Sequence, residues 1–156
     1  MEKQTPNINS TVEQFQSGSS CAQSVLAAYL PSLGIPVDLA HKMGAGLGGG
    51  IGGKQYVCGA LNAGVMVLST HLGNSDQSDT EKKQIATDYS RQFVERFEEK
   101  FGSAQCRDLL GEDTSTVAGK ERAAAADVYR KVCDQCVAHV CQGLDEFLGP
   151  DGVVES

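Results

Sequence analysis

The chain has 156 residues, of which 40% are hydrophobic, and a formal net charge of -7 at pH 7. This length suits one domain with one core, and the absence of any block of lysine or arginine argues against binding to nucleic acid or to an anionic membrane. The N-terminus lacks the apolar segment of a signal peptide, and the most apolar stretch, residues 57–68, is too short to span a bilayer. We therefore expect one cytoplasmic domain over residues 1–156, with frayed ends at residues 1–10 and 149–156.

The first half of the chain is predicted to be helical, because no stretch alternates apolar and polar residues with the period of a strand. The expected elements are a helical turn over residues 11–16, a helix over residues 21–30 and a short helix over residues 37–43. Ser19 or Ser20 can cap the second of these elements, and Pro31 can end it. Seven glycines among residues 44–53 then predict a loop or a close-packed irregular segment.

The second half is predicted to hold longer helices with apolar faces. The expected elements are helices over residues 58–72, 80–101, 106–110 and 120–148, the last broken near Gly143. Asp79 or Thr80 can cap the second of these helices, and Ser103 the third. Together the elements predict an all-α fold, a compact bundle of about five to six helices with a glycine-rich loop.

The helix over residues 80–101 carries a stripe of large apolar residues at every fourth position: Ile85, Tyr89, Phe93, Phe97 and Phe101. Four residues turn the helix by about 400°, so the stripe drifts by about 40° per step. Such a stripe favours a crossing contact with another helix. We interpret these side chains as core, in preference to a cofactor-stacking role.

The glycine-rich segment contains two partial matches to nucleotide-binding motifs. Residues 44–49 fit the spacing G-x-G-x-x-G, but a helical segment precedes them where a strand is needed. Residues 48–54 almost fit the P-loop, but Gln55 stands where Ser or Thr should hold magnesium. We therefore interpret the glycines sterically: they let the backbone pass close to another group. Exposed amides there, at Gly48, Gly49 and Gly50, could hydrogen-bond to sulfur or to an anion.

Four of the six cysteines lie at positions that suggest one shared sulfur site. Cys21, Cys58 and Cys106 stand where helices are predicted to begin, and Cys133 lies on the inward face of the last helix. A helix N-terminus favours the thiolate, which is the form that binds metals and attacks electrophiles. A set rich in cysteine and poor in histidine favours zinc or an iron–sulfur cluster. The alternative is that each cysteine is a small buried hydrophobe.

The remaining cysteines and the histidines carry weaker signals. Cys136 forms a CxxC pair with Cys133 inside a predicted helix, which is not the setting of a thioredoxin motif, and the next residue is not the histidine that haem attachment needs. Cys136 and Cys141 remain candidate ligands. The three histidines show no paired metal spacing, and His139 is expected in solvent because it lies opposite Cys133 on its helix.

Three further residues could contact the sulfur site. Gly59 follows Cys58 directly, and Asn62 lies one helical turn beyond it, so the amide of Asn62 could donate to sulfur; capping or a core hydrogen bond is the alternative. Arg107 could stabilise a thiolate at Cys106, and an ion pair with Asp108 or Asp113 is equally compatible with the sequence.

The chain resembles the C_GCAxxG_C_C family of redox-active proteins over about residues 14–141. The resemblance is carried by SCAQSV at residues 20–25, GLGGGIG at 46–52, CGA at 58–60, CRDLLG at 106–111 and KVC at 131–133. The chain departs from the CGAxxG motif because Ala63 occupies the position of the final glycine and Gly64 follows. The resemblance implies a helical domain with four characteristic cysteines: Cys21, Cys58, Cys106 and Cys133.

The family is similar to the non-haem part of split-Soret cytochromes c, in which an iron–sulfur centre has been proposed, and this chain lacks CxxCH haem sites. The resemblance thus implies a small redox-active protein that uses an iron–sulfur cluster for electron transfer to a redox partner protein. A metal-free thiol–disulfide oxidoreductase, a structural zinc or soft-metal module and a homodimer are the alternatives compatible with the sequence. Whether the protein is an enzyme is left open.

Overall fold

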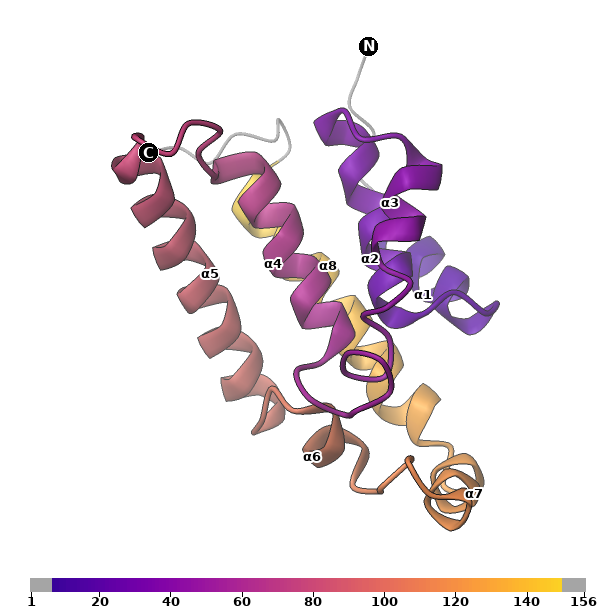
Figure 1. Ribbon diagram of the computed structural model, residues 1–156. Helices are drawn as coiled ribbons and strands as arrows, with labels where there is room; N and C mark the ends of the chain where they lie inside the picture. Colours follow the sequence, from indigo (N-terminus) through magenta and orange to yellow (C-terminus); the bar gives the residue numbers. More distant parts are fainter. Residues whose placement is uncertain (1–6, 150–156) are drawn as a thin grey trace.

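The computed structural model describes residues 7–149, and within this range every regular element is a helix (Figure 1). The α-helices are α1 (Ile8–Gln16), α2 (Cys21–Tyr29), α3 (Val37–Met43), α4 (Gly59–Leu72), α5 (Thr80–Phe101), α6 (Cys106–Leu110), α7 (Val117–Ala125) and α8 (Asp134–Leu148). A 3₁₀ turn, η1 (Leu30–Leu33), follows α2, and a π-helical turn, η2 (Tyr129–Cys133), precedes α8. The predicted all-α fold is confirmed.

The predicted number of about five to six helices is too low, because the last predicted helix is two helices. The break lies at Asp127, whose φ of 53° is left-handed, and not near Gly143, which lies inside α8. A left-handed conformation at a residue other than glycine leaves no clear signal in an alanine-rich sequence. The predicted turn at residues 11–16 is also a full helix, which begins at Ile8, within the stretch expected to be frayed.

Local capping sets where several helices begin. Ser20 accepts a hydrogen bond from the amide of Gln23, whose side chain accepts one from the amide of Ser20, so a capping box starts α2 at Cys21. Asp79 caps α5 through the amide of Lys82, as predicted. The N-cap of α6 is Gln105 and not Ser103.

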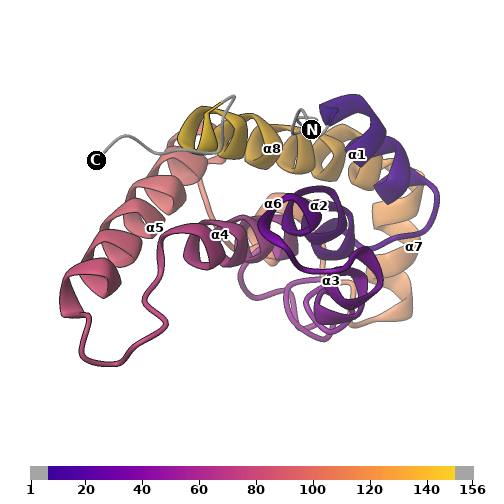
Figure 2. The same ribbon diagram turned by 90° about the horizontal axis from the view of Figure 1, so that it is seen from above.

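Helix α4 is the centre of the bundle. It packs against α2, α5 and α8, and Figures 1 and 2 show α2 and α5 on either side of it. Helix α8 packs along α4 and also contacts α1. One cluster of buried side chains joins these helices; its fully buried members include Leu26, Leu61, Val67, Val140 and Leu144.

The stripe on α5 meets α8 in a contact that we call the aromatic seam; it consists of Tyr89, Phe93, Phe97 and Phe101 of α5 and His139 and Phe147 of α8. The rings of Tyr89 and Phe93 meet the ring of Phe147 edge to face, with centroids 5.5 and 5.8 Å apart. Phe93 and Phe97 are 4% and 1% exposed, so the assignment of the stripe to the core is confirmed for them, whereas Ile85 at its N-terminal end is exposed.

His139 belongs to this seam, so the expectation that it lies in solvent is wrong. Its ring centroid lies 5.3 Å from that of Phe101 and 6.0 Å from that of Phe97, with both contacts edge to face. Burial, followed by the positive charges of Arg96 and Lys100, lowers the pKa of His139 below its usual 6.5. The angular argument placed His139 correctly away from Cys133, but it could not show that α5 covers that side of α8.

Candidate cysteine-lined redox site

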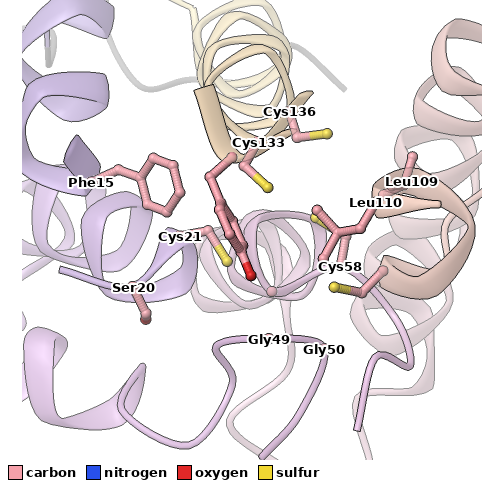
Figure 3. A pocket seen from close by; sticks show the side chains of 13 residues that line it. Phe15, Ser20, Cys21, Gly49, Gly50, Cys58, Leu109, Leu110, Cys133 and Cys136 are labelled. Carbon is pink, nitrogen blue, oxygen red and sulfur yellow. The ribbon is translucent and has the colours of Figure 1, made fainter. Parts of the chain in front are cut away.

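Five of the six cysteines line one cavity of about 120 Å³, which we call the cysteine pocket. Its lining residues are Phe15, Ser20, Cys21, Gly49, Gly50, Cys58, Gly59, Cys106, Leu109, Leu110, Tyr129, Cys133 and Cys136. Figure 3 shows Cys21, Cys58, Cys133 and Cys136 around this space, on segments that are far apart in sequence. All six cysteines of the chain are free thiols.

Helix starts place three of these sulfurs. Cys21 is the first residue of α2, directly after its capping box, and Cys58 is the N-cap of α4. Cys106 is the first residue of α6. A short antiparallel pairing joins the last two: the amide of Cys58 donates to the carbonyl of Ala104 at 2.8 Å, and the amide of Cys106 donates to the carbonyl of Tyr56 at 2.6 Å.

The last helical segment supplies the other side of the pocket. Tyr129 and Cys133 lie at the two ends of the π-helical turn η2, and Cys136 follows within the first turn of α8. Single π-helical turns are rare and occur frequently at functional sites. Asp127, with a left-handed φ of 53°, lies two residues before the start of this turn.

Glycines line the pocket where the backbone packs closely against other groups. A Cβ on Gly59 would lie 2.8 Å from the sulfur of Cys21 and 2.6 Å from the carbonyl oxygen of Leu47. A Cβ on Gly50 would lie 2.8 Å from the Cβ of Cys106, and the φ of Gly50 is +71°. Gly49 also lines the pocket, whereas a Cβ on Gly48 would meet the side chain of Ser20, 2.8 Å away. The glycine-rich segment thus passes close to the sulfurs, as a steric role requires.

The surroundings of Cys58 favour its thiolate. A hydrogen bond with the Cys136 thiol and the backbone amides of Leu61 and Ala60 at the start of α4 lower the pKa of Cys58 from 9.0 to about 7, against the opposing effect of burial. The same hydrogen bond and burial raise the pKa of Cys136.

The other pocket thiols are held protonated. Burial, followed by the charge of Cys58, raises the pKa of Cys21 to about 12 and that of Cys106 to about 11. Burial likewise raises the pKa of Cys133, with the charges of Cys21 and Cys58 adding to the effect. Several thiolates can therefore coexist in this apolar space only if a cation compensates them.

Three other residues considered from the sequence, Asn62, Arg107 and Cys141, make contacts away from the pocket sulfurs. The side chain of Asn62 donates to the carbonyl of Val57 at 3.5 Å, which is the alternative to a bond with sulfur. Arg107 forms an exposed ion pair with Asp113 at 3.3 Å. Cys141 lies outside the pocket lining and is fully buried beside Tyr29, whose hydroxyl donates to its carbonyl.

The sulfurs share a cavity but do not yet converge as ligands. Among residues 7–149, no group of three or more His, Cys, Asp or Glu side chains is arranged to hold a metal ion.

The same part of the chain contains no helix long and apolar enough to cross a membrane.

Several lining residues were not predicted from the sequence. Tyr129 lies four residues before Cys133, a spacing that could have indicated it, and its pKa is raised by burial and by the charges of Cys133 and Cys106. Phe15, Leu109 and Leu110 carry no signal beyond ordinary hydrophobicity, so only the tertiary arrangement assigns them to the site.

Comparison with known proteins gives one match. No curated protein and no solved structure matches the chain. The model of the family described as "Putative redox-active protein (C_GCAxxG_C_C)" matches residues 19–147, which is most of the chain and includes all five pocket cysteines. The chain therefore belongs to the C_GCAxxG_C_C family of redox-active proteins.

Proposed function

We propose that the protein is an electron-transfer protein whose cysteine pocket binds an iron–sulfur cluster. The observation that carries this proposal is the gathering of five thiols from distant segments around one cavity of about 120 Å³. Thiolates are the ligands of iron–sulfur clusters, and no carboxylate or imidazole is among the lining residues. The donor set therefore suits a soft, thiolate-bound centre better than a hard cation.

The pocket residues fit such a group in type, in number and in charge. Gly50 and Gly59 let the backbone lie close to Cys106 and Cys21, where a Cβ would clash. The pKa values of Cys21 and Cys106, raised to about 12 and about 11, show that these thiols need a compensating positive charge before they can ionise. Ligation would require rotation of cysteine side chains, since the described residues hold no preformed metal group.

Cys21, Cys58, Cys106 and Cys133 would hold the cluster, which supplies one-electron exchange when bound. The chain contributes the environment. The amides of Ala60 and Leu61 point their hydrogens toward the sulfur of Cys58 and stabilise negative charge there. Leu109 and Leu110 on one side and Phe15 on the other limit the access of water to the sulfurs. An unidentified redox partner protein would exchange the electron.

The test is the iron and acid-labile sulfide content of protein purified without oxygen, together with its visible spectrum. We expect iron and sulfide in equal amounts, with loss of both in Cys58→Ala and in Cys106→Ala. Cys141→Ala is the matched control, because Cys141 is buried but lies outside the pocket, and it should retain both. Zinc without sulfide would replace the proposal with a structural zinc module, and metal-free protein would contradict metal binding altogether.

A metal-free thiol–disulfide oxidoreductase is the second candidate, and the low pKa of Cys58, about 7, favours it. Exchange with a protein disulfide requires an accessible sulfur. Cys58 is only 7% exposed and Cys136 only 2%. This burial makes exchange with a large substrate less well supported than cluster binding.

A further inference from the structure

We infer that Cys58 and Cys136 form a disulfide inside the cysteine pocket when the metal-free protein meets hydrogen peroxide. Cys136 is not one of the four cysteines that the family motifs mark, so this is a modification site additional to the proposed cluster site. The inference does not rest on the proposed function, because it concerns the protein without a bound metal.

The contact between the two sulfurs is built into the packing of two helices. Cys58 begins α4 and Cys136 lies in the first turn of α8, and these helices pack side by side. The Cys136 thiol lies near enough to the sulfur of Cys58 to stabilise negative charge on it, and both residues line the same cavity. Thiols in such contact need only side-chain rotation to approach the disulfide bond length of about 2.05 Å.

The size of the cavity selects the oxidant. The pocket of about 120 Å³ has room for several water molecules, since about 10–15 Å³ of such space holds one. Hydrogen peroxide has two oxygen atoms and fits this space. The low exposure of both sulfurs, 7% for Cys58 and 2% for Cys136, keeps a peptide or protein disulfide from reaching them. The geometry therefore points to a small peroxide.

The chemistry balances with peroxide as the two-electron oxidant. The sulfur of Cys58 attacks one peroxide oxygen, the O–O bond breaks, and the departing hydroxide takes up the proton of the Cys58 thiol and leaves as water. The sulfur of Cys136 then attacks the resulting sulfenic acid of Cys58. The S–O bond breaks, the second hydroxide takes the proton of Cys136, and a second water leaves. Two thiols lose two electrons in total, and peroxide gains them.

Such a disulfide would change what the pocket can bind. It removes the thiolate of Cys58 from any set of metal ligands, because a disulfide sulfur has no negative charge to share. Reduction by a small thiol would restore it. Cys136 would thus link the redox state of the surroundings to the ligand set of the pocket.

The experiment uses the full chain, reduced and freed of iron by a chelator without oxygen, and one equivalent of hydrogen peroxide. Cleavage after lysine and arginine and before aspartate isolates Cys58 on residues 55–75 and Cys136 on residues 134–144, apart from Cys133. We expect a cross-link between these two peptides as the dominant product in mass spectrometry. Dominance of a link to Cys133 or Cys21, a mixture of pairings, or no thiol loss would overturn the inference.

Two matched variants separate the pair from its neighbours. Cys141 shares the peptide of Cys136 but lies outside the pocket, so Cys141→Ser should keep the cross-link. In Cys136→Ser the cross-link should fall by more than about tenfold, and the sulfenic acid of Cys58 should become trappable by dimedone. If Cys141→Ser lost the cross-link and Cys136→Ser kept it, the link would belong to Cys141 and the inference would be overturned.

The outcome can be separated from that of the proposed function. Iron and sulfide are measured on untreated protein, and the cross-link is measured after iron removal. Protein without iron but with the cross-link would refute only the cluster proposal. Protein with iron but without the cross-link would refute only the inference.

Discussion

The aromatic seam and the cysteine pocket both form where α8 meets neighbouring helices, yet one is filled and the other is hollow. In the seam, Phe93 occupies the space between Gly64 and Gly143, where a Cβ would lie 2.5 and 2.8 Å from its ring. In the pocket, Gly50 and Gly59 approach Cys106 and Cys21 just as closely, yet a cavity lined by sulfur remains beside them. Close approach at glycine thus accompanies a filled contact at one site and an unfilled cavity at the other.

The difference separates a densely packed contact from a region that keeps an unfilled cavity. Protein interiors are packed nearly as densely as organic crystals, so a cavity gives up contacts that a filled core would make. The pocket also contains a π-helical turn and lies next to a left-handed Asp127, two irregular features that the seam lacks. Irregular backbone and unfilled volume together are typical of a site kept for a ligand or a reaction.

Removal of the ring that fills the seam should have the largest effect. Phe93→Ala leaves a void between two glycines that cannot fill it, and we expect a loss of about 3–5 kcal/mol in the free energy of unfolding. Ile85→Ala, on the same helix at an exposed position, should cost less than about 1 kcal/mol. Urea unfolding of both variants measures the contrast. A cost below about 1 kcal/mol for Phe93→Ala would mean that the seam is not the better-packed region.

A methyl group added at the pocket should have a smaller but more specific effect. In Gly59→Ala the Cβ would press on the carbonyl of Leu47 and on the sulfur of Cys21, and we expect a loss of about 1–3 kcal/mol. Gly46→Ala is the matched control in the glycine-rich segment, since a Cβ there has no atom within 4 Å. Unfolding in urea gives the stability, and thiol titration of Cys21 reports on the pocket. Equal stability of the two variants would show that the pocket does not need its glycines.

Local signals in the sequence predicted the helix starts that place the sulfurs. Ser20, directly before Cys21, caps α2, because capping acts over a few residues, and the apolar spacing after Cys58 predicted α4. The long helix α5 was predicted over its full range because its caps and its apolar spacing agree. The gathering of cysteines from distant segments was predicted from their positions at expected helix starts and from the family resemblance.

The remaining features depend on contacts between distant segments. The pairing of Val57 with Gln105 brings Cys58 beside Cys106, and no local pattern encodes it. The contact of Cys136 with Cys58 depends on how α4 crosses α8. The break at Asp127 depends on a left-handed conformation that most residues avoid, so the sequence there still looks like a continuous helix.

The smallest expected effect is a pH dependence that has opposite signs at the two regions. Because burial lowers the pKa of His139, the unfolded chain binds more protons than the folded one below about pH 6.5, and the seam loses stability as the pH falls. Burial raises the pKa of Cys21 from 9.0 to about 12, so in metal-free protein this thiol contributes fully below pH 9.0 and loses its contribution as the pH rises towards about 12. We expect His139→Gln to reduce the loss of stability between about pH 7.5 and 5.5 by less than about 1 kcal/mol, because the ring is partly exposed. Urea unfolding of the variant and of the wild type at both pH values measures this difference. The carboxylates are the same in the two proteins, so their contribution cancels in the comparison. If the variant lost more stability than the wild type as the pH falls, the sign assigned to His139 would be reversed. The aromatic seam and the cysteine pocket would then no longer differ in the sign of their pH dependence.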